Sequence, residues 1–410
     1  MYIPRELEPA VRKHLERKEY TVITGARQTG KTTLLKHLYR EVKSGRPAFY
    51  LSFEDVDILT RINRHPEELF AFVPRPEGEK IYVFIDEIQY AANPTNFLKY
   101  LFDTYDDRLK VVATGSSVFY MDEKFKDSLA GRKRIFELKT LNFCEWLLFQ
   151  REDEMLAELD LIRRHPEYIS PFHRRLTALF DEFAVFGGYP RVALEEDPDE
   201  RMALLKELKN AFLKRDITET GVEQTEKFYQ LFTLLAAQTG NLLNRNELAS
   251  ILHLSHKTVD RYLTVLQKTF HIALVRPFYA NVRKELTKMP KIYFKDNGMR
   301  NVVLNRFYPF RNRDDNGALF ENYIYRRLTD LYDAEQIRFW RTADGKEIDF
   351  VVTRAFGEGT AYEVKLSCPR KKERALEVFR RAYPGHTVQT VTYENQPPCL
   401  WFLKLEKNDR

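Results

Sequence analysis

The stretch that most constrains the fold of this 410-residue chain is "YTVITGARQTGKTTLL", residues 20–35. An apolar run leads into a loop with the spacing Gly25-x-x-x-x-Gly30-Lys31-Thr32, and an apolar helix is expected directly after it. In this Walker A pattern, glycines let backbone N–H groups surround phosphates, the lysine reaches the β- and γ-phosphates, and the threonine hydroxyl faces Mg²⁺. A helix N-terminus adds a favourable dipole. The predicted ATP-contacting residues are Gly25, Ala26, Arg27, Gln28, Thr29, Gly30, Lys31, Thr32 and Thr33.

Further strand-like runs follow at the intervals that a parallel P-loop sheet needs. They are "PAFYLSFED", "KIYVFIDEIQ", "LKVVATGSS" and the run that begins "GRKRIFEL". In "KIYVFIDEIQ", the apolar residues are followed by Asp86 and Glu87. An acidic pair at that place predicts one carboxylate, Asp86, that holds the Mg²⁺ shell and one, Glu87, that polarises the attacking water.

The segments "GARQTGKT", "FIDEIQ", "TGSS", "LAGR" and "LNFCEW" together resemble AAA+ ATPases of the archaeal-type or STAND-like group, whose members carry an uncharacterised C-terminal domain. The resemblance spans nearly the whole chain. It implies a polar γ-phosphate sensor at Thr114 or Ser116 and assembly into a ring. Arg132 stands where an arginine finger or sensor could act, and a surface arginine is the alternative. "FGGYPR" is similar to the segment with which such ATPases contact the nucleotide base, which would assign Gly188 and Pro190 to that contact; an ordinary turn is the alternative.

Composition places the chain among globular proteins. With 43% hydrophobic and 31% charged residues it can build cores, and 410 residues exceed what one core usually holds, so two to four domains are expected. The three cysteines, Cys144, Cys368 and Cys399, lack metal-ligand spacing and fit a reducing compartment. The N-terminal residues lack the apolar core of a signal peptide, and no run approaches the roughly 20 apolar residues of a membrane span. We therefore expect a cytoplasmic protein.

The middle of the chain predicts helices followed by a winged helix-turn-helix. Residues 145–235 have helical apolar spacing and suit a lid, and residues 236–304 contain two helical runs followed by two strand-like runs. Residues 241–300 hold 11 Lys or Arg against 4 Asp or Glu, which favours contact with a polyanion such as DNA. A structural or protein-docking role is the alternative. The predicted DNA contacts are Ser255, His256, Lys257, Thr258, Arg261, Arg283, Lys284 and Lys288.

Residues 305–410 predict a third module with the order α–β–β–β–α–β. Its acidic and basic residues, Glu321, Asp349 and Glu363-x-Lys365, resemble the motif of the PD-(D/E)xK nuclease superfamily, although Ile348 stands where a proline often precedes the aspartate. The resemblance implies that Asp349 and Glu363 hold Mg²⁺ or Mn²⁺ with support from Glu321, and that Lys365 orients the water. A salt-bridged hairpin and a domain that only binds nucleic acid are the alternatives.

The sequence thus predicts an α/β chain: a P-loop AAA+ ATPase core (1–144), a helical lid (145–235), a winged helix-turn-helix (236–304) and a restriction-endonuclease-like domain (305–410). The function expected is ATP-dependent DNA processing with metal-dependent phosphodiester cleavage. A STAND-like switch with a protein partner, and a branched-DNA translocase with an inactive nuclease-like domain, remain the competing hypotheses.

Overall fold

The computed structural model describes residues 2–116, 129–165, 168–217, 220–279, 283, 285, 288–355, 358–367 and 374–393. The chain divides into two compact units. The first comprises Met1–Thr140 with Lys268–Phe270, and the second comprises Leu141–Gln267 with His271–Arg410. The segments predicted as lid, winged helix and C-terminal domain therefore fall mainly in the second unit.

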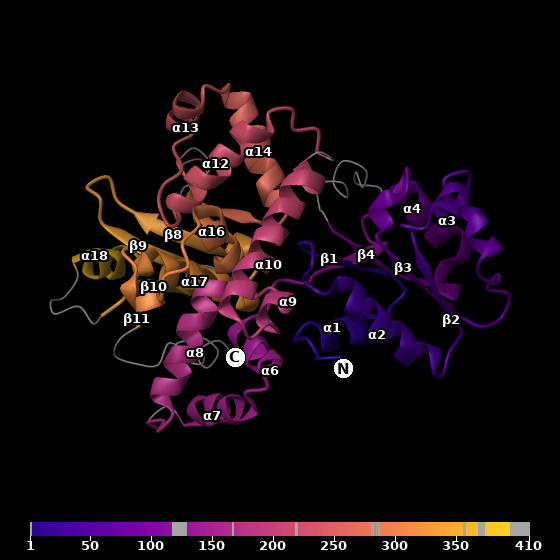
Figure 1. Ribbon diagram of the computed structural model, residues 1–410, viewed down its shortest axis with the longest axis horizontal. Coiled ribbons are helices and arrows are strands. Elements are labelled where there is room, and N and C mark those ends of the chain that lie inside the picture. The colour runs from indigo at the N-terminus through magenta and orange to yellow at the C-terminus, as the bar shows by residue number, and fades with distance from the viewer. Residues whose placement is uncertain are drawn as a thin grey trace. The chain divides into compact units, whose positions relative to one another are not determined.

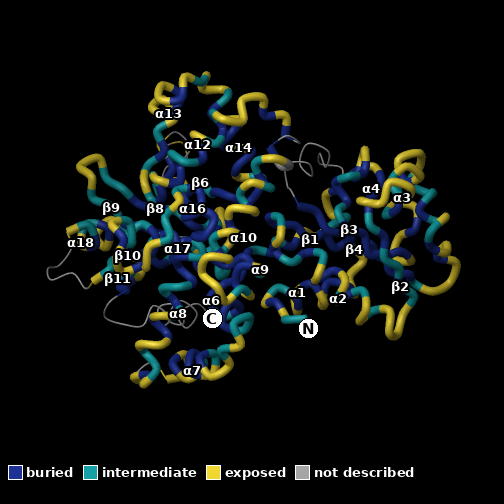
Figure 2. Tube along the Cα trace, in the orientation of Figure 1, coloured by how far each residue is buried: buried dark blue, intermediate teal, exposed yellow. Residues whose placement is uncertain are grey.

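The first unit is built on a five-stranded parallel sheet with the order β2-β3-β4-β1-β5. The strands are β1 (Tyr20–Thr24), β2 (Ala48–Ser52), β3 (Ile81–Asp86), β4 (Leu109–Gly115) and β5 (Lys133–Glu137). Every residue of β1, β3 and β4 is buried, as expected for parallel strands covered on both faces (Figure 2). Because the carboxyl ends of parallel strands meet at one edge, the Walker A loop and Asp86 are brought together there.

Helices cover both faces of this sheet (Figure 1). Leu34, Leu35 and Leu38 of α2 (Lys31–Lys43) pack with α1 (Glu8–His14) on one face. Phe97 and Leu101 of α4 (Pro94–Tyr105) pack with Ile62 of α3 (Val56–Ile62) on the other. Short turns η1 (Pro66–Ala71), η2 (Ile88–Tyr90) and η3 (Asp106–Arg108) link these elements.

The second unit begins with helices and an antiparallel strand pair. The helices are α6 (Phe143–Phe149), α7 (Asp153–Arg164), α8 (His173–Phe186), α9 (Pro190–Ala193), α10 (Pro198–Ala211) with the π-helical turn η4 (Phe212–Asp216), α12 (Thr225–Ala237), α13 (Arg245–Leu252) and α14 (His256–Lys268). The strands β6 (Ile272–Val275) and β7 (Lys291–Phe294) follow, and then α16 (Asn297–Leu304) and the turn η5 (Phe310–Asn312). Helix–helix–strand–strand is the order expected for residues 236–304.

The last part of the second unit has the element order predicted from the sequence. After α17 (Asn316–Leu331) and η6 (Ala334–Gln336) come β8 (Ile337–Arg341), β9 (Glu347–Ala355), β10 (Glu358–Lys365), α18 (Arg374–Ala382) and β11 (His386–Thr392). The sheet order is β11-β10-β9-β8, with β10 and β11 parallel and the other pairs antiparallel. The apolar segment "LWFLKL", residues 400–405, lies outside the described residues.

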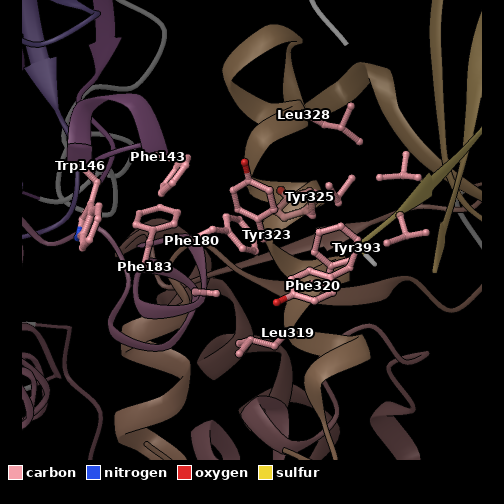
Figure 3. Packing of buried hydrophobic residues seen from close by; sticks show 14 of the residues in the cluster. Phe143, Trp146, Phe180, Phe183, Leu319, Phe320, Tyr323, Tyr325, Leu328 and Tyr393 are labelled. Carbon is pink, nitrogen blue, oxygen red and sulfur yellow. The ribbon is translucent and has the colours of Figure 1, made fainter. Parts of the chain in front are cut away.

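One hydrophobic core joins the first helices of this unit to its C-terminal sheet (Figure 3). Phe143 and Trp146 of α6 and Phe180 of α8 belong to the same buried cluster as Tyr323 and Tyr393. The rings of Phe180 and Tyr323 meet edge to face, with centroids 4.7 Å apart. The helices predicted as a lid are thus packed against the C-terminal domain through large aromatic side chains.

Replacing Phe180 with alanine should destabilise the second unit by about 3–5 kcal/mol, because the ring is fully buried and its removal leaves a cavity. Urea unfolding followed by tryptophan fluorescence measures this loss. Ile169→Ala is the control, since Ile169 is 88% exposed and should cost almost nothing. Equal stability of the two variants would contradict a shared core.

Candidate functional site

The Walker A loop has the backbone that its glycines predict. Gly25 has φ 146°, and a Cβ at this position would lie 2.2 Å from the carbonyl oxygen of Leu138, so no other residue fits there. Gly30 caps α2 in the left-handed region. The ammonium of Lys31 is buried within the loop and donates to the carbonyl oxygens of Gly25 (3.0 Å) and Ala26 (2.8 Å). The loop thus has the backbone conformation of the predicted phosphate-binding loop, and its lysine lies inside it.

A buried arginine that sequence reasoning missed supports the loop from outside. The Arg5 guanidinium donates to the carbonyl oxygen of Thr29 at 2.8 Å and to that of Lys139 at 2.8 Å. It connects the P-loop to the segment after β5. No local pattern marks this residue, because its partners lie 24 and 134 positions away in the sequence.

Asp86, at the end of β3, accepts hydrogen bonds from three surrounding elements. They come from the hydroxyls of Thr32 on α2 (3.0 Å), Tyr50 on β2 (2.9 Å) and Thr114 on β4. Burial, together with the Asp86 carboxylate, raises the pKa of Tyr50 above its ordinary value, so the phenol keeps its proton. A threonine hydroxyl and a carboxylate at this distance form the oxygen donor set that Mg²⁺ prefers, so the residues present fit the predicted ion.

Glu87 follows Asp86 in the left-handed region, with φ 56°. Its backbone N–H donates to the Thr114 hydroxyl at 3.0 Å, and its carboxylate accepts from the Gln89 side chain. Gln89 also donates to the Ser116 hydroxyl at 2.9 Å. The structure thus brings the predicted base, Glu87, and the predicted sensor, Ser116, to the same edge of the sheet as the P-loop.

Other residues assigned to the nucleotide have structural partners. Arg132 forms a two-pronged ion pair with Asp103 of α4 (2.7 and 3.2 Å), so its role as a finger or sensor stays a prediction. Gly188 lies in the second unit, where its N–H donates to Asp296 and an added Cβ would lie 2.2 Å from the carbonyl oxygen of Leu141. Pro190 opens α9 in that unit. The close contact with Leu141 is sufficient to require a glycine at position 188. Contact of Gly188 and Pro190 with the nucleotide base stays a prediction.

Several of the predicted DNA contacts form hydrogen bonds within the chain. Ser255 and Thr258 hydrogen-bond to each other at the start of α14. Arg261 donates to the carbonyl oxygens of Thr220 and Gly221. The candidates with an exposed basic or imidazole side chain are His256, Lys257, Arg261, Arg283 and Lys288, and Lys284 lies outside the described residues.

Two basic residues that produced the local charge excess are buried. Lys291 pairs with acids of α17 and β9, and Arg300 pairs with Asp315 at 2.8 Å. Their partners lie outside the 241–300 window that gave the excess. The positive surface of this segment is therefore weaker than the sequence count implied.

Lys291 is the centre of the acidic cluster that the sequence assigned to a nuclease. Its ammonium lies 3.2 Å from Glu321, 2.5 Å from Glu347 and 3.5 Å from Asp349, and its side chain is 3% exposed. The Tyr293 hydroxyl, two residues along β7, donates to Glu321 at 2.6 Å. Burial alone lowers the pKa of Lys291, but the carboxylates of Glu321, Asp349 and Glu347 outweigh it and hold the pKa above its ordinary value. A protonated lysine thus offsets part of the negative charge of this cluster.

The remaining nuclease-motif residues lie on the adjacent strands β9 and β10. Asp349 accepts a hydrogen bond from the backbone N–H of Val364 at 2.8 Å, which joins it to the strand that carries Glu363 and Lys365. Lys365 pairs with Glu363. Within the described part of the chain, one group of three His, Cys, Asp or Glu residues has ligand atoms within 4.8 Å of one another, namely Glu8, His37 and Glu41. The predicted metal ligands Glu321, Asp349 and Glu363 do not reach that spacing.

Sequence reasoning could have found Lys291. A lysine in the strand-like run "KIYF" needs a partner when that strand is buried, and Tyr293 shares its face two residues later. The sequence does not indicate which acids pair with Lys291, because they lie 30 to 58 positions further along the chain.

Family comparisons cover three parts of the chain. Residues 17–147 match a model described as an AAA domain. Residues 177–309 and 316–399 match two domains of unknown function, DUF8612 and DUF4143. The AAA match agrees with the parallel sheet and its P-loop, so the predicted α/β class with an AAA+ ATPase fold is confirmed.

Relatives along most of the chain are themselves uncharacterised. A protein of Haemophilus influenzae is 24% identical over 353 residues, covering 82% of this chain and 79% of that protein. One of Mycobacterium tuberculosis is 26% identical over 394 residues, covering 93% and 80%. The chain thus joins an AAA+ ATPase-like domain to segments whose relatives have no assigned function.

The solved structures that resemble this chain superpose on it with low TM-scores. The RuvB Holliday junction branch migration motor of Thermotoga maritima has a TM-score of 0.31 at 15% identity, covering 65% of this chain and 87% of that one. AMPPCP-bound DnaA of Aquifex aeolicus has a TM-score of 0.32 at 15% identity, covering 65% and 89%. No conclusion about function follows from scores this low. Among the helices that the structure describes, none has the length and apolar character to cross a membrane.

Replacing Lys291 with methionine should cost about 3–5 kcal/mol of stability, because it keeps the apolar volume but leaves three largely buried carboxylates without their cation. Chemical unfolding of the variant measures the loss. Lys288→Met is the matched control, since Lys288 is exposed. A loss no larger than that of the control would show that the cluster does not depend on Lys291.

The pH dependence of stability should reveal the raised pKa of Glu321. Burial, and then the charge of Asp349, raises the pKa of Glu321 from 4.5 to about 7, although Lys291 and Tyr293 act in the opposite direction. Its contribution to stability is therefore fully present below pH 4.5 and is lost as the pH rises through 7. Glu321→Gln mimics the protonated form, so its stability relative to wild type should increase between these pH values. A constant difference across that range would contradict the shifted pKa.

Proposed function

We propose that this chain hydrolyses ATP and uses the nucleotide cycle to control binding of DNA. The observation that supports hydrolysis most strongly is the 3.0 Å contact between the predicted Mg²⁺ ligands Thr32 and Asp86. Thr32 directly follows the P-loop lysine in the chain, and Asp86 directly precedes Glu87. Mg²⁺ on Thr32 and Asp86 would neutralise phosphate charge when bound. Lys31 would neutralise further charge, and Glu87 would accept a proton from the attacking water.

DNA binding rests on the second unit. Lys257 lies on α14 and Arg283 and Lys288 lie between β6 and β7, and all three are exposed, which suits contacts to phosphates on a winged-helix surface. The burial of Lys291 and Arg300 reduces the charge available, so we expect modest affinity. Docking of a protein partner on this surface is the competing hypothesis.

DNA cleavage by the C-terminal domain is the second candidate. The α–β–β–β–α–β order and the link from Asp349 to the Glu363 strand favour it. Lys291 weighs against it, because an ammonium within 3.5 Å of three carboxylates offsets part of their negative charge and would repel Mg²⁺ or Mn²⁺. We therefore propose that this domain does not cleave DNA while Lys291 occupies the cluster. Ring assembly through Arg132 stays open.

Steady-state ATPase measurements test the first claim. Lys31→Ala should lower kcat about 10²–10³-fold, because the cation that faces developing phosphate charge is lost. Lys43→Ala, an exposed position on the same helix, is the control and should retain wild-type turnover. Equal activity of the Lys31 variant and wild type would refute the site.

Fluorescence anisotropy with duplex DNA at several salt concentrations tests the second claim. The triple variant Lys257→Ala, Arg283→Ala and Lys288→Ala should bind more weakly and reduce the slope of log K against log salt by about 3, since each phosphate contact contributes about 0.9. Lys206→Ala, exposed on α10, serves as the control. An unchanged slope would favour the protein-docking alternative.

A further inference from the structure

Gln89 lies directly behind the predicted hydrolytic carboxylate. The left-handed backbone of Glu87 turns the chain at the end of β3. Gln89 follows on the short turn η2, and its amide reaches the Glu87 carboxylate. Gln89 is 6% exposed, so its amide is withdrawn from solvent. None of the predicted roles for the ATP site includes this side chain.

The chemistry of its neighbours fixes how the amide is oriented. Nε2 donates to a carboxylate oxygen of Glu87 and to the Ser116 hydroxyl at 2.9 Å. A carboxylate only accepts hydrogen bonds, so the NH₂ group and not the carbonyl must face Glu87. Within the described residues, the Gln89 carbonyl oxygen is buried and has no hydrogen-bond partner. Leaving a buried acceptor unpaired is unfavourable, which indicates that the two donated bonds determine this position.

The backbone and the side chain of Glu87 are each connected by hydrogen bonds to the end of β4. Its backbone N–H is bonded to Thr114, and its carboxylate is joined through Gln89 to Ser116, two residues further on. Thr114 in turn donates to Asp86. A displacement of Ser116 would therefore be transmitted to the Glu87 carboxylate through one side chain.

We propose that Gln89 is a positioning residue that holds the Glu87 carboxylate for water activation and couples it to Ser116. This inference rests on the ATPase function proposed above and adds a specific link between two of its residues. Gln89 does not contact the reacting atoms. It acts by restricting where the Glu87 oxygens lie, and a small displacement of a catalytic group is enough to slow the chemical step.

Gln89→Met keeps the side-chain length and removes both donors. We expect kcat for ATP hydrolysis to fall about 10–100-fold, while the Kd for a fluorescent ATP analogue changes less than about twofold. Thr95→Val is the matched control, because it also alters a buried, unpaired polar atom of the first unit, and it should leave kcat unchanged. A merely structural role would instead lower nucleotide affinity and melting temperature together with kcat.

A double-mutant cycle tests the coupling to Ser116. Ser116→Ala should lower kcat by a smaller factor in the Gln89→Met background than in the wild-type background. The link is already broken in Gln89→Met, whereas a direct contact of Ser116 with phosphate is lost in both backgrounds. Additive effects would overturn the coupling, and wild-type turnover in Gln89→Met would overturn the positioning role while the ATPase assignment stands. ATP hydrolysis by wild type that does not exceed that of Lys31→Ala would overturn both proposals.

Discussion

The contact of Lys291 with Glu321, Glu347 and Asp349 joins three elements of the second unit. These four side chains come from β7, α17 and β9, and a cation withdrawn from solvent compensates the repulsion among three carboxylates. Separating β7 from α17 and β9 would leave the acids without compensation, at a cost of about 3–5 kcal/mol. Tyr293 reinforces the same junction through Glu321. The strand pair of the predicted DNA-binding segment and the C-terminal sheet are therefore held as one body.

The predicted nucleotide site instead depends on one carboxylate that accepts hydrogen bonds from the hydroxyls of three surrounding elements. Asp86 accepts from Thr32, Tyr50 and Thr114, so α2, β2 and β4 all converge on the end of β3. Glu87 and Gln89 extend this network to Ser116. Since Thr32 would face Mg²⁺ and Ser116 the terminal phosphate, binding or loss of phosphate can alter both ends of the network. Such an arrangement suits a protein that responds to its nucleotide.

Features set by local pattern were predictable from the sequence. Gly25, Gly30 and Lys31 specify their loop through backbone sterics and phosphate chemistry, and the apolar run before Asp86 specifies a buried strand. Parallel strands bring these motifs to one edge, so the ATP site follows without further information. The order of elements after residue 316 also followed from periodicity and turn residues.

Features that depend on distant contacts were not predictable. Lys291 and Arg300 count as positive charge in any sequence window, but they are neutralised by acids that only the fold brings near. Likewise, the apolar faces of α6 and α8 indicate burial without indicating the partner, which is the C-terminal sheet. Arg5 and Gln89 act through backbone carbonyls and a single amide, and neither has a distinguishing spacing.

The most direct test of this account is a count of divalent-ion sites. Titration of Mn²⁺ in the presence of ATP is followed by the electron paramagnetic resonance signal of free Mn²⁺, and the Mn²⁺ taken up by an ATP-only blank is subtracted. It should detect protein-dependent binding that Asp86→Asn removes and Asp349→Asn leaves unchanged. That result is expected if Lys291 serves as the cation of the C-terminal cluster. Mn²⁺ binding that persists in Asp86→Asn and disappears on adding Asp349→Asn would contradict the account, because the acids would then hold a metal despite the lysine.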